Sequence, residues 1–143
     1  MTENTRRVAV WIGCGDKRLG KQREEIKETL GLAAYMYTPA GGALALVCNG
    51  IDPDGAALKE VHKYVTVGHP ELFVVEAHHD CGAVKKLLGK IFKDEAEERV
   101  FLLENLDRAK KLLELHFPGK QVLGVISTPG SDGVKAVFDH EAA

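Results

Sequence analysis

Long apolar runs, a strong charge of one sign and abundant cysteine are all missing from this sequence. No apolar run approaches the roughly 20 residues of a transmembrane helix, and the N-terminal stretch lacks the small-residue cleavage site of a signal peptide. A net charge of −2 gives no electrostatic reason to expect nucleic acid or an anionic membrane as a partner. Three cysteines, an odd count, argue against a disulfide framework. A reducing, cytoplasmic setting with free thiols is the default expectation.

The order of the hydrophobic segments predicts the fold class. The 143 residues suit one domain, 1–143, with a substantial core. Strand-like segments alternate with amphipathic helical ones, which predicts an α/β three-layer sandwich with a mostly parallel sheet covered on both faces. The expected strands are 7–13, 32–38, 72–77 and 121–127, with an antiparallel edge strand at 134–139. The expected helices are 21–31, a segment within 51–68, 83–91 and 96–116.

Local signals place the ends and faces of these helices. Gly31 is expected to close the first helix. Asp52 is a suitable N-cap for the second helix, and Pro53 suits its first position. In the fourth helix, apolar residues at helical spacing predict a buried stripe. These residues are Leu102, Leu106, Ala109 and Leu113.

Two of the predicted strands end abruptly in polar residues. Strand 7–13 is followed by the stretch Cys-Gly-Asp-Lys-Arg (14–18), and strand 72–77 by His-His-Asp-Cys-Gly (78–82). In open α/β sheets, sites form at the carboxyl ends of strands, where the strand order reverses. With the order 2-1-3-4, numbered along the chain, the first and third strands flank that point. We therefore expect the two polar loops to meet.

Cys14, His78 and Cys81 would then form a set of two thiolates and one imidazole. Zn²⁺ favours tetrahedral sulfur and nitrogen ligands, and catalytic sites leave the fourth position to water or substrate. The His-x-x-Cys spacing allows one tight turn to present both ligands, with Gly82 free to adopt the backbone angles such a turn requires. Alone, this spacing is a weak signal. Combined with Cys-x-Asp-x-Arg at another strand end, it predicts a zinc site.

The two loops together resemble the signature loops of the beta-class carbonic anhydrases. The stretches "CGDKR" (14–18) and "HHDCGAVKKL" (78–87) carry the resemblance, and "PAGGAL" (39–44) and "GVISTPGSDGVKAV" (124–137) extend it. The resemblance implies that Cys14, His78 and Cys81 bind zinc. It also implies that Asp16 and Arg18 form a catalytic pair.

The activity implied by the resemblance is that of a carbonate dehydratase, the reversible hydration of CO₂ to bicarbonate by a zinc-bound hydroxide. Asp16 would accept a hydrogen bond from the zinc-bound water, and Arg18 would hold Asp16 and keep it ionised. In some members of that family the same aspartate binds the zinc instead, so Asp16 is an activator, a fourth ligand, or both. The family pairs its subunits, which implies a homodimer or higher homo-oligomer.

Other functions remain open. One is a zinc hydrolase acting on carbonyl sulfide or carbon disulfide. Another is a non-catalytic zinc-binding protein. Two departures favour the latter: Tyr37-Thr38-Pro39 replaces the usual Arg-Asn, and six residues precede the first strand where the family carries a helical arm. Thiol redox chemistry ranks last, because the sequence has no Cys-x-x-Cys pair.

The remaining reactive or large residues have simpler interpretations. His79 is expected to be a solvated neighbour of the site or a proton carrier, and Asp80 to cap the helix that follows. Cys48 has no partner motif and is interpreted as a small core residue. Trp11 and Phe73 lie in predicted strands and are expected in the core.

Overall fold

The computed structural model describes residues 6–129 and 137–139, whose strands form a single sheet of order β2-β1-β3-β4-β5. The strands β1 to β4 run parallel, which confirms the predicted order 2-1-3-4. β5 pairs antiparallel with β4, and residues 134–136 of the predicted edge strand lie outside the described part. The strands are β1 (Arg7–Ile12), β2 (Leu32–Tyr37), β3 (Leu72–His78), β4 (Gln121–Ser127) and β5 (Val137–Asp139).

The register of the central strands places the two polar loops at the same edge of the sheet. Ile12, the last residue of β1, pairs with Val75 of β3. His78, the last residue of β3, pairs with Ser127 of β4. Cys14 follows two residues after Ile12, so the loop after β1 begins beside the end of β3.

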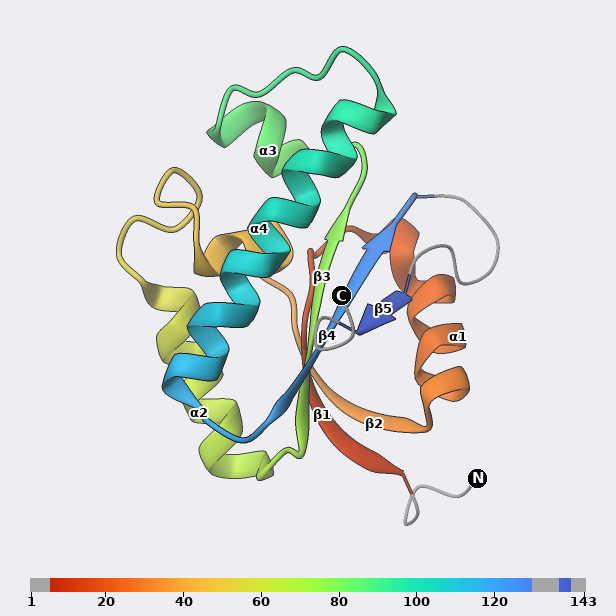
Figure 1. Cartoon of the computed structure of the whole chain (residues 1–143), viewed down its shortest axis with the longest axis vertical. Helices are drawn as coiled ribbons and strands as arrows, with labels where there is room; N and C mark the ends of the chain where they lie inside the picture. Colours follow the sequence, from red (N-terminus) through yellow and green to blue (C-terminus); the bar gives the residue numbers. More distant parts are fainter. Residues whose placement is uncertain (1–5, 130–136, 140–143) are drawn as a thin grey trace.

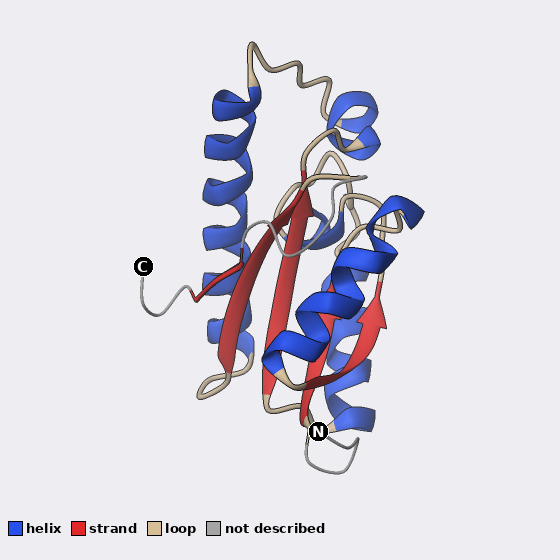
Figure 2. Ribbon diagram, turned by 90° about the vertical axis from the view of Figure 1, so that its right-hand side faces the viewer, coloured by secondary structure: helices blue, strands red, loops and turns tan. Residues whose placement is uncertain are grey.

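Helices cover both faces of the sheet. α1 (Gly20–Leu30) lies on one face, and α2 (Ala56–Gly68) and α4 (Glu95–His116) lie on the other (Figure 1). Figure 2, viewed from the α1 side, shows that helix in front of the strands. The short helix α3 (Gly82–Leu87) and the 3-10 turns η2 (Lys17–Leu19) and η3 (Gly42–Leu46) follow strands at the site edge. Over residues 6–129 and 137–139, no helix is both long and apolar enough to cross a membrane.

The core contains the residues that the hydrophobic pattern predicted. Trp11 and Phe73 are fully buried, on opposite faces of the sheet. The apolar stripe predicted for the long helix is also buried and packs against β3 and β4. The sheet is therefore packed by helices on both faces, and its polar loops project from one end.

Two helix boundaries differ from the prediction by more than one residue. α2 begins at Ala56 and not at Pro53, because Gly55 adopts a left-handed φ of 70° before the helix starts. Asp52 still caps its first turn, accepting hydrogen bonds from the backbone N–H groups of Ala56 and Ala57 at 3.2 and 2.8 Å. α3 ends at Leu87 instead of residue 91, and Gly89, at a φ of 64°, turns the chain away.

Candidate metal centre

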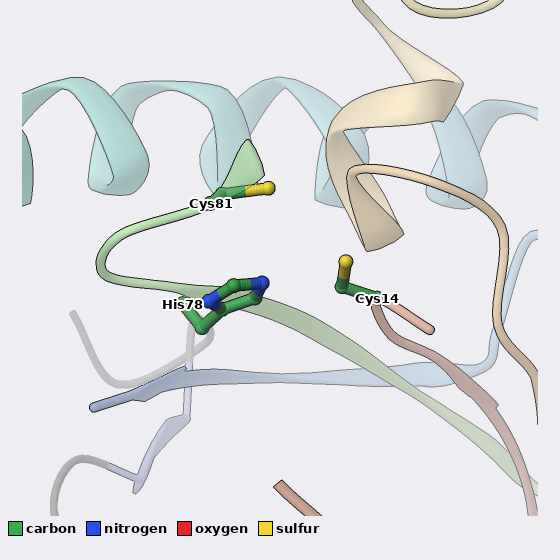
Figure 3. A group of neighbouring side chains, drawn as sticks. All are labelled: Cys14, His78 and Cys81. Atoms are coloured by element: carbon green, nitrogen blue, oxygen red, sulfur yellow. The ribbon is translucent and has the colours of Figure 1, made fainter. Parts of the chain in front are cut away.

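The loops after β1 and β3 bring three candidate ligands together. The Sγ atoms of Cys14 and Cys81 and a ring nitrogen of His78 all lie within 4.8 Å of one another. Figure 3 shows the two sulfur atoms and the imidazole ring facing a common space. The side chains are buried, with exposed fractions of 9% for Cys14, 1% for His78 and 4% for Cys81. The predicted meeting of the two loops is confirmed.

The imidazole of His78 is oriented to bind a metal through Nε2. Its Nδ1 lies 2.7 Å from the carbonyl oxygen of His79. Because a carbonyl oxygen only accepts, Nδ1 carries the proton. Nε2 is buried and makes no hydrogen bond of normal geometry to any other described residue. A buried polar atom without a partner is costly, whereas a metal ion would satisfy its lone pair, so the donor set fits such an ion.

Cys14 and Cys81 share one proton, which decides which of the two sulfurs is charged. The pKa of Cys14 is lowered to about 4, chiefly by a hydrogen bond from Cys81 and against the effect of burial. The pKa of Cys81 is raised, because its proton is shared with Cys14 and because burial disfavours a second thiolate. Burial also opposes the charged form of His78, but the facing Cys14 sulfur, the carbonyl of His79 and the charge of Asp16 together outweigh burial, and the pKa of His78 is raised. The pair therefore carries one thiolate and one thiol, and binding a metal ion would remove the shared proton.

Backbone N–H groups reach both sulfur atoms. The N–H of Gly41 donates to Cys14 from the turn after β2. The N–H groups of Ala83 and Val84, at the start of α3, donate to Cys81. Donors of this kind hold thiolates in place and tune their basicity toward a metal. Two segments, the turn after β2 and the start of α3, thus hold the sulfur atoms of the two cysteines.

Asp16 is clamped by Arg18 at the edge of the three candidate ligands. Its Oδ1 accepts from the backbone N–H and Nε of Arg18 at 2.9 and 3.0 Å, and its Oδ2 accepts from Nη2 at 2.6 Å. These hydrogen bonds lower the pKa of Asp16 to about 2. Oδ2 also lies 4.0 Å from Nε2 of His78. The carboxylate is therefore ionised, held in one orientation and close to the candidate ligands.

Asp80 does not cap α3, contrary to the prediction. It has a left-handed φ of 60°, and Cys81 occupies the N-cap position in its place. The Asp80 carboxylate instead forms an ion pair with Lys85 and accepts from Nη1 of Arg18 at 3.4 Å. Hydrogen bonds from Lys85 and Arg18 lower its pKa. Arg18 therefore links the loop after β1 to the loop after β3.

His79 is enclosed and hydrogen-bonded, which corrects the prediction of a solvated side chain. It is 6% exposed, and its Nδ1 lies 2.6 Å from Oε1 of Glu98 in α4. The other carboxylate oxygen of Glu98 accepts from the backbone N–H of Asp80 at 2.9 Å. The backbone N–H of His79 donates to the carbonyl of Ser127 at 2.9 Å. Glu98, which no motif in the sequence identified, braces the ligand loop against α4.

A cavity borders the same loop without reaching the candidate ligands. Its volume is about 580 Å³, and its lining includes His79, Asp80, Phe92 and Glu98. The three candidate ligands are not part of that lining.

Cys48 lies apart from the three candidate ligands. It is partly buried, with its Sγ 3.4 Å from Oδ1 of Asn105. This agrees with its interpretation as a core residue.

A buried ion pair supports the end of β1 from the other face of the sheet. Glu76, in β3, has no exposed surface, and its Oε1 accepts from Nε of Arg23 at 2.9 Å. Arg23, in α1, also donates to the carbonyl oxygen of Cys14. The sequence could have identified Glu76 as a buried charge, because it stands inside the apolar run "LFVVEAH". It could not have identified Arg23, which lies among other charged residues of an amphipathic helix.

Comparisons with known proteins identify the fold. No protein-family model and no curated protein sequence matches the chain. The crystal structure of the beta-carbonic anhydrase CafA of the fungal pathogen Aspergillus fumigatus is similar, with a TM-score of 0.56 and 22% identity over 94% of this chain and 76% of that one. A tetrameric beta-carbonic anhydrase of the filamentous ascomycete Sordaria macrospora has a TM-score of 0.53 and 19% identity, over 84% of this chain and 75% of that one. The chain therefore has the fold of the beta-carbonic anhydrases.

Proposed function

We propose that the chain binds one zinc ion through Cys14, His78 and Cys81 and catalyses the reversible hydration of CO₂. The observation that carries the proposal is the convergence of two sulfurs with a buried imidazole Nε2 that has no hydrogen-bond partner among the described residues. Zn²⁺ takes ligands of these types in a tetrahedral arrangement. The fold, which the chain shares with structures of beta-carbonic anhydrases, supports the choice of reaction.

The residues around the candidate ligands have distinct roles in this proposal. Zinc, when bound, supplies Lewis acidity and a water made acidic enough to act as a nucleophile near neutral pH. Asp16 provides an anionic hydrogen-bond acceptor at the edge of the ligand set, because its low pKa keeps it ionised. Arg18 fixes the orientation of that carboxylate through paired, charge-assisted hydrogen bonds. Both oxygens of Asp16 are held by Arg18, which supports a role as acceptor over one as fourth ligand.

The test is a stopped-flow assay of CO₂ hydration on protein whose zinc content has been measured. Asp16→Asn serves as the informative variant, because it retains the three ligands and replaces the anionic acceptor with a neutral amide. We expect zinc-loaded wild-type protein to accelerate hydration, and the variant to keep its zinc and lose roughly ten- to a hundredfold in rate. A variant as active as wild type would contradict the role given to Asp16.

A non-catalytic zinc protein is the second candidate, and burial is the observation that favours it. His78 is 1% exposed and Cys81 4% exposed, as expected for a metal site enclosed by protein. The same assay separates the two candidates. Stoichiometric zinc with hydration at the uncatalysed rate, in both wild-type protein and Asp16→Asn, would favour the structural role.

We also propose that the chain forms a homo-oligomer. One similar structure is that of a tetrameric beta-carbonic anhydrase. The edge strand β2 is the type of element that proteins cover by pairing with another chain. Light scattering at micromolar concentration should give a mass of at least two chains, and a monomer mass would contradict the proposal.

The free cysteines support a reducing compartment such as the cytoplasm. Cys14, Cys48 and Cys81 all carry unpaired sulfur atoms in the structure. Zinc binding needs the first and third of these as thiolates, which an oxidising compartment would not preserve. Localisation of a tagged protein by microscopy is the corresponding measurement.

A further inference from the structure

The carboxylate of Glu76 is held by side chains from three other elements. Its Oε1 accepts from Arg23 Nε and Nη2, at 2.9 and 2.5 Å, and from the indole Nε1 of Trp11 at 3.3 Å. Its Oε2 accepts from the hydroxyl of Ser127 at 3.3 Å. A fully buried carboxylate in the middle of a sheet is costly unless its charge is paired and its lone pairs are satisfied. Here α1, β1 and β4 together supply those partners.

Arg23 connects this buried carboxylate to the first candidate ligand. Its Nη2 donates both to Oε1 of Glu76 and to the carbonyl oxygen of Cys14. Gly13 makes the approach feasible, since a Cβ there would lie 2.1 Å from Glu76 Oε1 and 2.8 Å from Arg23 Nη2. The guanidinium therefore fixes the peptide that leaves Cys14 toward Asp16. The neighbouring Gln22 donates to the carbonyl of Thr128 at 2.6 Å, which ties the same turn of α1 to the end of β4.

We propose that Arg23 and Glu76 are positioning residues for the metal centre, acting through the backbone of Cys14. The inference rests on the proposed zinc binding by Cys14, His78 and Cys81. Glu76 orients the guanidinium of Arg23, and Arg23 holds the Cys14 carbonyl so that its Sγ faces the other two ligands. Neither side chain touches the metal. Together they fix the position of Cys14, whose side chain lies on the opposite face of the sheet.

Stability alone is a weaker explanation for this pair. Replacing a buried ion pair with neutral groups of similar size is often neutral or stabilising, whereas removing one partner strands a buried charge. The double variant Arg23→Met/Glu76→Gln removes both charges. The amide introduced at position 76 can still accept the hydrogen bond from Trp11, whereas the thioether introduced at position 23 cannot donate to the Cys14 carbonyl. If the pair only stabilises the fold, this variant should bind zinc as tightly as wild-type protein does. If the pair positions Cys14, the variant should bind zinc more weakly.

The experiment measures zinc affinity by competition with a chromophoric chelator, and the ultraviolet charge-transfer band of bound Cd²⁺ as a signature of the cysteine ligands. Wild-type protein is compared with Arg23→Met/Glu76→Gln and with Arg23→Lys, which keeps the buried charge but not the planar fork. Leu113→Ala is the matched control, a core truncation in the last turns of α4. Circular dichroism checks that each apo protein is folded.

We expect the double variant to bind zinc about ten- to a hundredfold more weakly, as for outer-shell partners of metal ligands, and to show a shifted Cd²⁺ band. Arg23→Lys should weaken binding in the same direction, and it provides the test should the double variant not fold. Leu113→Ala should lower stability with its zinc affinity and Cd²⁺ band unchanged. Zinc affinity within twofold of wild type in the folded Arg23 variants would overturn the positioning role while leaving the proposed function intact. Wild-type protein without zinc would overturn both.

Discussion

Gly42 approaches Cys14 so closely that a Cβ on Gly42 would lie 2.6 Å from the Cys14 amide nitrogen. The same Cβ would lie 2.7 Å from the carbonyl oxygen of Glu76, and Gly42 has a left-handed φ of 58°. The absence of a side chain therefore allows η3 to pack against the ends of β1 and β3. It also allows the preceding Gly41 to donate its N–H to the Cys14 sulfur.

The substitution Gly42→Ala should therefore destabilise the protein. A strained φ and a contact with rigid backbone each cost on the order of 1–3 kcal/mol, and we expect a loss of at least about 2 kcal/mol in the free energy of unfolding. Gly20→Ala is the matched control, because a Cβ at Gly20 would meet nothing within 4 Å. Urea unfolding of both variants is the measurement. Equal stability of the two would show that the close approach is not a constraint.

Zinc content should depend on Cys14 and not on Cys48. Cys14→Ser removes one of three candidate ligands, and we expect a fall from about one zinc per chain to little or none after dialysis. Cys48 lies outside the ligand set, with its Sγ beside Asn105, so Cys48→Ser should retain the metal. Elemental analysis of protein purified without added metal measures both. Undiminished zinc in Cys14→Ser would remove the basis for the site.

Zinc binding near neutral pH should release protons. In the metal-free protein, Cys14 is already a thiolate because its pKa is about 4, whereas Cys81 keeps its proton because its pKa is raised. We expect about one proton from Cys81, and a further fraction from His78, whose pKa is also raised. Calorimetric titration with Zn²⁺ in buffers of different ionisation enthalpy counts the protons. A count of zero would mean that the two thiols do not share a proton as described.

Asp16 should stabilise the fold above about pH 4 and lose that effect in acid. Hydrogen bonds from Arg18 lower its pKa from an ordinary 3.8 to about 2. A carboxyl group whose pKa falls on folding stabilises the folded state while it is ionised, and this stabilisation disappears as the pH falls through the folded pKa. The stability difference between wild type and Asp16→Asn should thus be present at pH 6 and shrink between pH 4 and 2. Chemical unfolding of the metal-free proteins across this range measures it, and a difference independent of pH would contradict the assigned pKa.

The sequence contained enough information for the sheet and the three candidate ligands. Polar residues after two apolar strands, and the topology of parallel sheets, were sufficient to bring Cys14 and His78 together. The buried stripe of α4 followed from helical spacing alone. These features depend on local pattern and on rules common to all α/β proteins.

Contacts that depend on side-chain direction were beyond the sequence. Nothing in the helical segment 96–116 indicated that Glu98 would accept hydrogen bonds from both His79 and the Asp80 backbone. Asp80 has a left-handed φ, and its carboxylate contacts the side chains of Lys85 and Arg18 instead of capping the first backbone N–H groups of α3, which is likewise a consequence of how the loop packs. The tertiary structure determines which polar side chains meet across long sequence separations, and the periodicity of the sequence does not predict these contacts.

The most direct test of the account is the rate of CO₂ hydration as a function of zinc occupancy. Apo protein, prepared with a chelator, is loaded with zinc in steps from none to one equivalent, and each sample is assayed by stopped flow at constant pH. If Cys14, His78 and Cys81 hold a catalytic zinc, the rate should rise in proportion to occupancy and level off at one zinc per chain. A rate that stays at the uncatalysed value up to full occupancy would contradict the enzymatic account.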